Sequence, residues 1–568
     1  MYSHKTYNFL KEFKGKLYDG DLPTLPEVFQ IAAARYPEKR CLSIYNPVKF
    51  GLSYSETREK VMTLAASLVS AGVKKGDRVI LTGKNSPEWM ISFYAIATAG
   101  AVIVPLDYSL HIDEMKHLIN FSEPVAAIVD DEKYDCIGEL FPEDFIRYSL
   151  SDKKPGYVLG LTDKPLDKPV HCDINDTVAI LFTSGTTGTP KGVMLSHSNM
   201  VNDIFLSQMN MQIYHTDVFY ALLPVHHAYT MLSVLGVGIA QSAEVVFAKR
   251  LVIKEILNDL RDGKITIFLG VPMLFNKFLA NIMKGVQEKG AVTYCLVRFL
   301  MFVSGFLKSV FGIKIGKKLF GKMILDKACL SSVRICISGG GPLPPKTFKM
   351  FNELGLDFVQ GYGLTETSPI LTLNPIYHFK VKSVGKIIPE MEVKIVNPDK
   401  EGRGEIAVRG PIVMQGYYKN PGATDEVMDL SGFFYTGDMG YVDKENYLYL
   451  TGRKKNIIVT AGGKNVFPEE IEDKFQLYPE IGQILIRGYN ADKKKNQGEE
   501  IEALIYPAED VRNWNDPDRI QKKMEEIVSA VNKQLLHYMK ITRVRTVDTP
   551  FEESSTKKIK RYKVDKSC

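Results

Sequence analysis

The sequence predicts an α/β protein, because helical and strand patterns alternate along its first half. Residues 61–70 and 89–98 repeat apolar side chains at helical spacing, whereas residues 78–82 and 102–104 form short apolar strands. Such alternation is typical of helices layered on largely parallel sheets. At 568 residues the chain is too long for one compact core, so at least two domains are expected.

The pattern changes twice towards the C-terminus. Residues 333–337 form another apolar strand, but from about residue 385 short β segments alternate with Gly, Pro and Asn. From Arg453 onwards a β/α pattern with many charges begins. We therefore expect an N-terminal domain of residues 1–452, with a β subdomain at about 385–452, and a C-terminal domain of residues 453–568.

Bulk properties exclude several classes of protein. The net charge of +6 is small for this length, and no basic-aromatic module is present, so no nucleic acid partner is expected. The first 13 residues lack the apolar core of a secretory signal. Seven scattered cysteines without a Cys-x-x-Cys pair argue against disulfides or zinc and for a reducing cytoplasm.

One apolar segment, residues 294–313, is long enough to span a membrane. It contains Arg298 and Lys308, and Ser304-Gly305 interrupts it, so spanning is not expected. The segment is interpreted as a pair of helices packed on the domain. The alternative is an amphipathic surface that contacts lipid, which would place the protein at the inner face of a membrane.

The most informative motif is the glycine- and hydroxyl-rich segment at residues 183–193, directly after the apolar run 178–182. A buried strand that ends in such a loop can direct backbone N–H groups, hydroxyls and an ammonium towards one polyphosphate. A P-loop would require Gly in place of Pro190 and Ser or Thr in place of Gly192. A flexible glycine linker is the simpler alternative, but it does not account for the Pro-Lys-Gly that follows the hydroxyl residues.

This segment resembles the phosphate loop of the adenylate-forming enzymes, which include acyl-CoA synthetases, aryl-CoA ligases, luciferases and peptide-synthetase adenylation domains. The resemblance extends over essentially the whole chain. It implies an N-terminal domain of two layered α/β subdomains plus a small β subdomain, followed by a mobile C-terminal α+β lid. It also implies ATP and Mg²⁺, because a carboxylate must be converted to an acyl-adenylate before a thiol can accept it.

By resemblance, one group of residues binds the triphosphate and the metal. Glu366 and Thr186 would hold Mg²⁺, a set of few protein oxygens that suits this ion. Lys191 would contact the phosphates. The remaining residues of the loop are Thr183, Ser184, Gly185, Thr187 and Gly188.

A second group would bind the nucleoside. Tyr362 resembles the ring that stacks on adenine, and Asp438 and Arg453 resemble the ribose contacts. Around Tyr362, two glycines would give the base room. The other members of this group are Gly339, Gly340, Gly341, Gly361, Gly363, Leu364 and Thr365.

The C-terminal domain would serve both half-reactions. Lys558 resembles the lysine that bridges the substrate carboxylate and the α-phosphate, although a solvated basic tail is the simpler interpretation. Rotation about Lys455 would withdraw it. Gly463 resembles the glycine that leaves room for the pantetheine arm of CoA.

The class of acid is predicted from two residues of the expected acyl pocket and from one inserted segment. His227 and Gly341 resemble residues of the acyl pocket, although a structural histidine at a strand end is an alternative for His227. Residues 285–330 resemble the helical insertion of long-chain fatty acyl-CoA synthetases. The leading prediction is therefore a fatty acid–CoA ligase. The alternatives are an acyl–acyl-carrier-protein synthetase, a ligase for a medium-chain or aryl acid, and a non-catalytic lipid- or nucleotide-binding scaffold. The sequence does not specify an oligomeric state.

Overall fold

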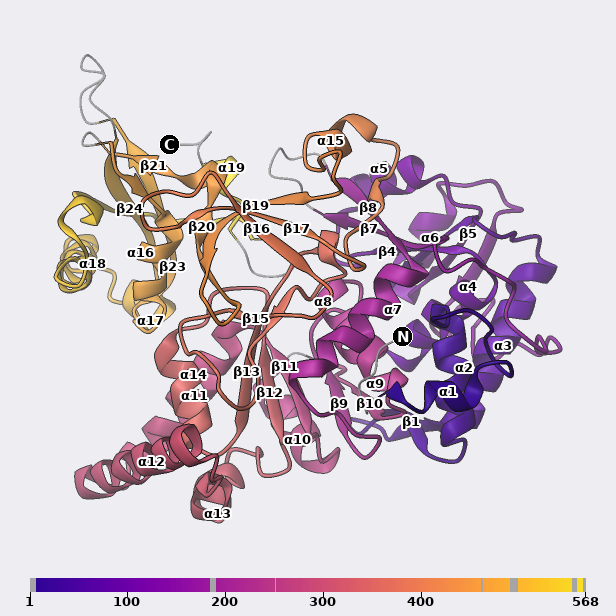
Figure 1. Cartoon of the computed structure of the whole chain (residues 1–568), viewed down its shortest axis with the longest axis horizontal. Coiled ribbons are helices and arrows are strands. Elements are labelled where there is room, and N and C mark those ends of the chain that lie inside the picture. Colours follow the sequence, from indigo (N-terminus) through magenta and orange to yellow (C-terminus); the bar gives the residue numbers. More distant parts are fainter. Residues whose placement is uncertain are drawn as a thin grey trace.

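The computed structural model describes residues 7–183, 190–250, 252–460, 463–490, 499–553 and 559–564. Helices cover two large sheets, and a smaller C-terminal unit lies at the upper left of Figure 1. This arrangement positions the ends of several strands around the predicted site residues.

The first sheet has seven strands and a mainly parallel centre. In spatial order its strands are β18 (Gly416–Tyr417), β8 (Lys191–Ser196), β7 (Thr177–Thr183), β4 (Val102–Leu106), β3 (Arg78–Thr82), β5 (Ala126–Val129) and β6 (Ile146–Ser149). The strands from β7 to β6 run parallel, whereas β7, β8 and β18 pair in antiparallel fashion. The predicted strands at 78–82 and 102–104 are therefore confirmed, the second with two more residues.

The second sheet has thirteen strands and combines a parallel half with an antiparallel half. The strands that form or flank the parallel half are β2 (Phe50–Ser53), β1 (Arg40–Ile44), β10 (Glu244–Phe247), β9 (Val218–Ala221), β11 (Ile267–Gly270), β12 (Ile335–Ser338) and β13 (Asp357–Tyr362). The antiparallel half continues through β14 (Thr372–Leu373), β15 (Gly385–Ile387), β20 (Tyr447–Arg453), β19 (Phe434–Val442), β17 (Gly404–Arg409) and β16 (Glu392–Val396). The β segments expected from about residue 385 thus continue the same sheet beyond its parallel half.

Local sequence explains where the covering helices begin. The Ser53 side chain caps α3 (Tyr54–Ser70) in a capping box with Glu56. Ser86 caps α4 (Pro87–Thr98), and Pro87 occupies its first turn. The other helices of ten or more residues in the N-terminal part are α2 (Leu25–Arg35), α5 (Ile112–Ser122), α7 (His197–Leu206), α10 (Ile253–Asp262), α11 (Pro272–Gln287) and α12 (Ala291–Phe311).

The segment at 294–313 differs from the expected pair of helices, because residues 294–311 lie in one continuous helix, α12. Ser304 and Gly305 do not break it. A Cβ atom at Gly305 would lie 2.7 Å from Cγ of Glu353 on α14 (Pro345–Glu353), so the small residue permits close helix packing. This helix meets the length and hydropathy criteria for a membrane span, with 22% of its apolar window buried.

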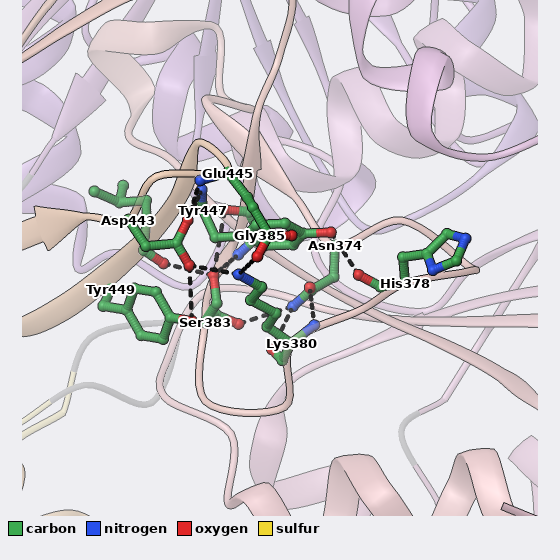
Figure 2. Close-up of polar contacts among 10 residues, drawn as sticks. Asn374, His378, Lys380, Ser383, Gly385, Asp443, Glu445, Tyr447 and Tyr449 are labelled. Atoms are coloured by element: carbon green, nitrogen blue, oxygen red, sulfur yellow. Dashed lines mark hydrogen bonds and ion pairs between the residues drawn. The ribbon is translucent and has the colours of Figure 1, made fainter. Parts of the chain in front are cut away.

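The loop between β14 and β15 is attached to the β19–β20 turn by a polar network (Figure 2). The Lys380 ammonium lies 2.7 Å from carboxylate oxygens of both Asp443 and Glu445. The Ser383 hydroxyl donates to the Leu448 carbonyl at 2.7 Å. These contacts attach the β14–β15 loop to strands β19 and β20, which carry Asp438 and Arg453.

The C-terminal strands form sheets of their own. One sheet contains β23 (Ile481–Tyr489), β24 (Glu500–Pro507) and β25 (Arg543–Thr546), and the other contains β21 (Ile458–Val459) and β22 (Asn465–Val466). The α-helices described in this part of the chain are α16 (Pro468–Glu472), α17 (Glu509–Arg512), α18 (Pro517–Asn532) and α19 (Arg561–Val564).

Candidate active site

The predicted phosphate loop connects two antiparallel strands. Thr183 at the end of β7 pairs with Lys191 at the start of β8, which confirms the expected strand before the loop. Ser184, Gly185, Thr186, Thr187 and Gly188 lie outside the described residues. The Lys191 ammonium lies 4.7 Å from the ring centroid of Tyr417, on the neighbouring strand β18, a distance suited to a cation–π contact.

Tyr417 connects this strand pair to the predicted metal ligand. Its hydroxyl donates a hydrogen bond of 2.9 Å to Oε1 of Glu366. Burial, together with the Glu366 charge, raises the pKa of Tyr417, so the phenol remains a neutral donor. Tyr417 has no expected site role in the sequence, where the Gly-Tyr-Tyr segment at 416–418 reads as structural. The 51 positions between Tyr417 and Glu366 leave no local pattern to reveal the pair.

The donor set around Glu366 fits a hard cation. Its carboxylate is anionic oxygen, the ligand type that Mg²⁺ prefers, and only Oε1 accepts the Tyr417 hydrogen bond. The backbone is held in place because the Met414 N–H donates to the Glu366 carbonyl at 2.9 Å. Thr186, the other expected metal ligand, lies outside the described residues.

Tyr362, Asp438 and Arg453 form one connected group. The Tyr362 hydroxyl donates to Oδ2 of Asp438 at 2.6 Å, and Nε of Arg453 lies 2.7 Å from Oδ1 of the same carboxylate. Asp438 and Arg453 are direct partners in the register of β19 and β20. The structure thus brings together three residues that the sequence separates by up to 91 positions, from 362 to 453.

The electrostatics of this group follow from burial. Burial, reinforced by the Asp438 carboxylate, raises the pKa of Tyr362 well above its ordinary value. Burial alone would lower the pKa of Arg453, but Asp438 and, more weakly, Glu366 contribute to raising it. Arg453 therefore remains a cation within electrostatic range of both carboxylates.

The glycines of this segment are required by the chain itself. A Cβ atom at Gly363 would lie 1.6 Å from the Pro369 carbonyl oxygen, and one at Gly361 would lie 3.0 Å from the Thr372 carbonyl oxygen. Close protein atoms therefore explain why both positions need glycine, and no bound ligand has to be invoked. Next to them, the Leu364 N–H donates to the Thr367 hydroxyl at 2.9 Å, within the 3-10 turn Thr365–Thr367.

The three glycines after β12 form a turn beside an aromatic side chain. Gly340 has a φ of +78°, which favours glycine, and a Cβ atom at Gly339 would lie 2.9 Å from the Tyr229 ring. The Tyr229 hydroxyl donates to the Ile337 carbonyl at 3.2 Å. A Cβ atom at Gly341 would meet Pro272 at 3.7 Å, an ordinary contact, so this position has more space.

His227 belongs to a cluster with His226 and Asp107. The two imidazole rings have centroids 4.2 Å apart, and Nε2 of His226 lies 3.5 Å from Oδ2 of Asp107. Burial alone would raise the pKa of Asp107, but His226 lowers it below its ordinary value. One ligand atom from each of the three residues lies within 4.8 Å of the others. Because Asp107 and His226 are more than 100 positions apart, no local sequence pattern indicates their contact.

The C-terminal site residues are described in part. Lys455 lies in a 3-10 turn, Lys454–Asn456, directly after Arg453. Gly463 has a φ of +66°, and a Cβ atom there would meet none of the described residues within 4 Å. Lys558 lies outside the described residues.

The chain three residues after Lys558 is firmly attached. Arg561 donates to both carboxylate oxygens of Glu472 at 2.5 Å and to the Ile486 carbonyl at 2.8 Å. A bidentate arginine–carboxylate pair sets position as well as charge. The start of α19 is thus attached to α16 and β23.

The sequence is similar to those of known enzymes. Residues 29–418 match the AMP-binding enzyme family. The chain is 27% identical to the chloroplastic long-chain fatty acid–acyl-carrier-protein ligase AEE15 of Arabidopsis thaliana, over 90% of this chain and 80% of that protein. It is 28% identical to a feruloyl-CoA synthase of Amycolatopsis sp., over 81% of this chain and 84% of that protein.

The fold also resembles a solved structure. ATP-bound MatB from Rhodopseudomonas palustris superposes with a TM-score of 0.75 at 22% identity, covering 96% of this chain and 99% of that one. This likeness confirms the expected adenylate-forming fold. The family match covers more than half of the sequence, from before α3 to the end of β18. The chain therefore belongs to the AMP-binding enzyme family.

Proposed function

We propose that this enzyme activates a fatty acid with ATP and transfers the acyl group to CoA. In the first step a carboxylate oxygen attacks the α-phosphorus, forming acyl-AMP and releasing pyrophosphate. In the second step the thiol sulfur attacks the acyl carbon, AMP leaves with the bonding electron pair, and the thiol proton passes to solvent. The observation that carries the proposal is a pair of connected groups, Lys191–Tyr417–Glu366 and Tyr362–Asp438–Arg453, which the short segment from Tyr362 to Glu366 joins.

The nucleotide roles rest on this geometry. Asp438 is a buried carboxylate whose oxygens are oriented by Tyr362 and Arg453, so it suits a ribose hydroxyl donor. Tyr362 presents its ring beside that carboxylate, as a base-stacking residue would. Lys191, at the end of the hairpin, supplies a cation for the phosphates.

The metal role rests on Glu366. Mg²⁺ bound there, with Thr186 as its second protein ligand, would neutralise phosphate charge. The Tyr417 hydroxyl and the Met414 N–H orient Glu366 for this task.

The domain roles are also proposed. Residues 1–452 would form the adenylation domain, and residues 453–568 a lid that turns near Lys455. In one orientation Lys558 would stabilise the transition state of adenylate formation; in the other, the open space at Gly463 would admit pantetheine. The Arg561–Glu472 pair supports the first role, because it attaches the Lys558 segment to the lid.

The acid and the acceptor are inferred from the relatives. The AEE15 relative acts on long-chain fatty acids and a carrier protein, whereas the other relative is a feruloyl-CoA synthase. A fatty acid–carrier-protein ligase is therefore the second candidate, and an aryl-CoA ligase the third. His227 and Gly341 would line the acyl pocket in each case.

The test is a screen of free acids from short to long, together with aryl acids, with ATP, MgCl₂ and CoA, following AMP release. A long-chain optimum with acyl-CoA as product is expected. AMP release that requires acyl carrier protein would favour the second candidate, and an optimum for aryl acids would favour the third. No AMP with any acid would overturn the proposal.

A further inference from the structure

The outward side of α12 carries a continuous apolar stripe, called here the outer α12 face. Its members are large apolar residues, each more than half exposed: Val292 (84%), Leu296 (56%), Phe299 (62%), Phe302 (55%), Phe306 (51%) and Val310 (57%). They recur every three or four positions, so they lie on one side of the helix. A helix of 21 residues is about 31 Å long, and the stripe runs along nearly all of it.

The apolar surface continues past the end of the helix. Phe311 and Ile313 are 63% and 49% exposed, and Met323, beyond α13 (Gly316–Phe320), is 54% exposed. Figure 1 shows α12 and α13 projecting from the body of the molecule at its lower left. Contiguous apolar surface of this kind is uncommon on a protein surface unless it contacts something.

The opposite side of α12 is held on the domain by buried contacts. Val297, Met301, Ser304 and Lys308 are buried and recur at helical spacing. The Lys308 ammonium donates to Asn352 at 2.6 Å and to Asp357 at 2.8 Å. Removing this charge from its buried partner would be costly, so the helix cannot leave the domain to cross a bilayer. It is built to lie along a surface.

The charge of the segment that contains α12 indicates what kind of surface this face contacts. Residues 272–327 contain ten Lys and Arg but only two Asp and Glu, whereas the rest of the chain contains 62 basic and 64 acidic residues. The positive charge of the protein is thus concentrated in this segment. The exposed lysines of this segment are Lys277, Lys284, Lys289, Lys314, Lys318, Lys322 and Lys327.

We propose that the outer α12 face docks on an anionic phospholipid membrane. Aromatic side chains would enter the headgroup–acyl boundary, and the surrounding lysines would contact anionic headgroups. A second copy of this chain fits less well, because pairing two such faces would bring two strongly basic segments together. The proposal does not depend on which acid the enzyme activates.

The test is flotation of the full chain with vesicles of phosphatidylcholine, with and without phosphatidylglycerol. Wild-type protein should float only with the anionic vesicles, and added salt should weaken this binding. The Phe299→Glu/Phe302→Glu/Phe306→Glu variant should lose about tenfold or more of its partitioning. The matched control is Val48→Glu/Leu430→Glu/Leu536→Glu, which places the same charges at exposed apolar sites elsewhere and should float like wild type.

The lysines are tested separately. Lys318→Glu/Lys322→Glu should reduce flotation with anionic vesicles, whereas Lys382→Glu/Lys400→Glu, an equal charge change at other exposed lysines, should not. Equal flotation of the Phe variant and its control would overturn the proposal. Wild-type flotation that does not depend on phosphatidylglycerol would also overturn it. The same holds if wild-type protein is a dimer that does not bind vesicles and the Phe variant is a monomer.

One added tryptophan, read as the difference from the emission of the native Trp89 and Trp514, protects the test against misfolded variants. Leu296→Trp places an indole on the outer α12 face, and its fluorescence should shift to the blue and be quenched by brominated anionic lipid. Leu536→Trp, at a comparably exposed site, should show neither change. An unchanged Leu296→Trp spectrum in the presence of anionic vesicles would contradict docking through this face.

Discussion

The Tyr362 hydroxyl donates a hydrogen bond of 2.6 Å to the Asp438 carboxylate, across 76 positions of sequence. Arg453 takes the other oxygen of that carboxylate at 2.7 Å. The residue proposed to stack on the base thereby orients the residue proposed to bind the ribose. A carboxylate held from two sides keeps a fixed orientation, so this pair of contacts preorganises the proposed nucleoside site.

Tyr362→Phe tests this orientation. Loss of a hydrogen bond to a charged group should raise KM for ATP about tenfold, because it costs on the order of 1.5 kcal/mol, with a smaller change in kcat. Tyr435→Phe is the control, since Tyr435 lies on β19 with Asp438 but its hydroxyl donates to Asp429, at 3.3 Å. An unchanged KM for ATP in the Tyr362 variant would show that the Asp438 carboxylate needs no such support.

The attachment of α19 gives a prediction for the lid. Glu472→Gln should weaken the anchor of Arg561 and slow adenylate formation by about tenfold or more, because the adjacent Lys558 segment loses its position. Thioester formation from supplied acyl-adenylate should change little. The control is Glu552→Gln, which contacts Lys560 and Lys563 on the exposed side of the same segment. Equal effects on both half-reactions would contradict a role in positioning Lys558.

The two proposed lid functions can be separated by one pair of variants. Lys558→Ala should abolish most adenylate formation and spare thioester formation from supplied acyl-adenylate. Gly463→Leu should do the reverse. No described residue fills the space beside Gly463, so a side chain there would occupy the proposed path of the thiol arm. Since Gly463 has a φ of +66°, Gly463→Asn serves as a control for backbone strain. A normal thioester rate in Gly463→Leu would move the tunnel elsewhere.

His197 should make the protein sensitive to mild acid. Burial lowers the pKa of His197 to about 4, and its Nδ1 accepts a hydrogen bond from the Leu25 N–H at 3.2 Å, which requires an unprotonated nitrogen. The unfolded state therefore binds more protons between about pH 6.5 and pH 4, so stability falls as pH falls through this window. From pH 7 to pH 5 the loss should be about 2 kcal/mol.

This loss is measured from unfolding at the two pH values. His197→Gln retains an acceptor for Leu25 and should remove that part of the pH dependence, whereas His171→Gln, at an exposed site, should leave it in place. If His197→Gln kept the wild-type slope, another group would be responsible for the acid sensitivity.

Much of the fold could be predicted from local pattern. The strand before the phosphate loop and the strand at 78–82 appear where apolar runs indicate them, because buried parallel strands need such runs. The continuity of the β subdomain with the parallel sheet could not be predicted, since β14 has only two residues and carries no strand signal. The break expected at Ser304-Gly305 was wrong, because packing against Glu353 favours small residues there and overrides their weak helix propensity.

The candidate site shows the same division. Motif order identified Tyr362, Glu366 and Asp438, whose proposed roles remain predictions. Tyr417 was missed as a site residue, because its contact with Glu366 depends on how β18 pairs with β8. The Asp107–His226 contact was missed for the same reason, as it joins the end of β4 to a loop more than 100 positions later.

The central claim is that this chain forms an acyl-adenylate, and exchange of labelled pyrophosphate into ATP tests it most directly. With purified protein, Mg²⁺ and a long-chain fatty acid, label should enter ATP without any CoA, and Glu366→Gln should reduce the rate by about a hundredfold or more. Glu405→Gln, whose carboxylate contacts Lys454, should exchange normally. Exchange that needs no carboxylic acid, or none with any acid offered, would contradict the account.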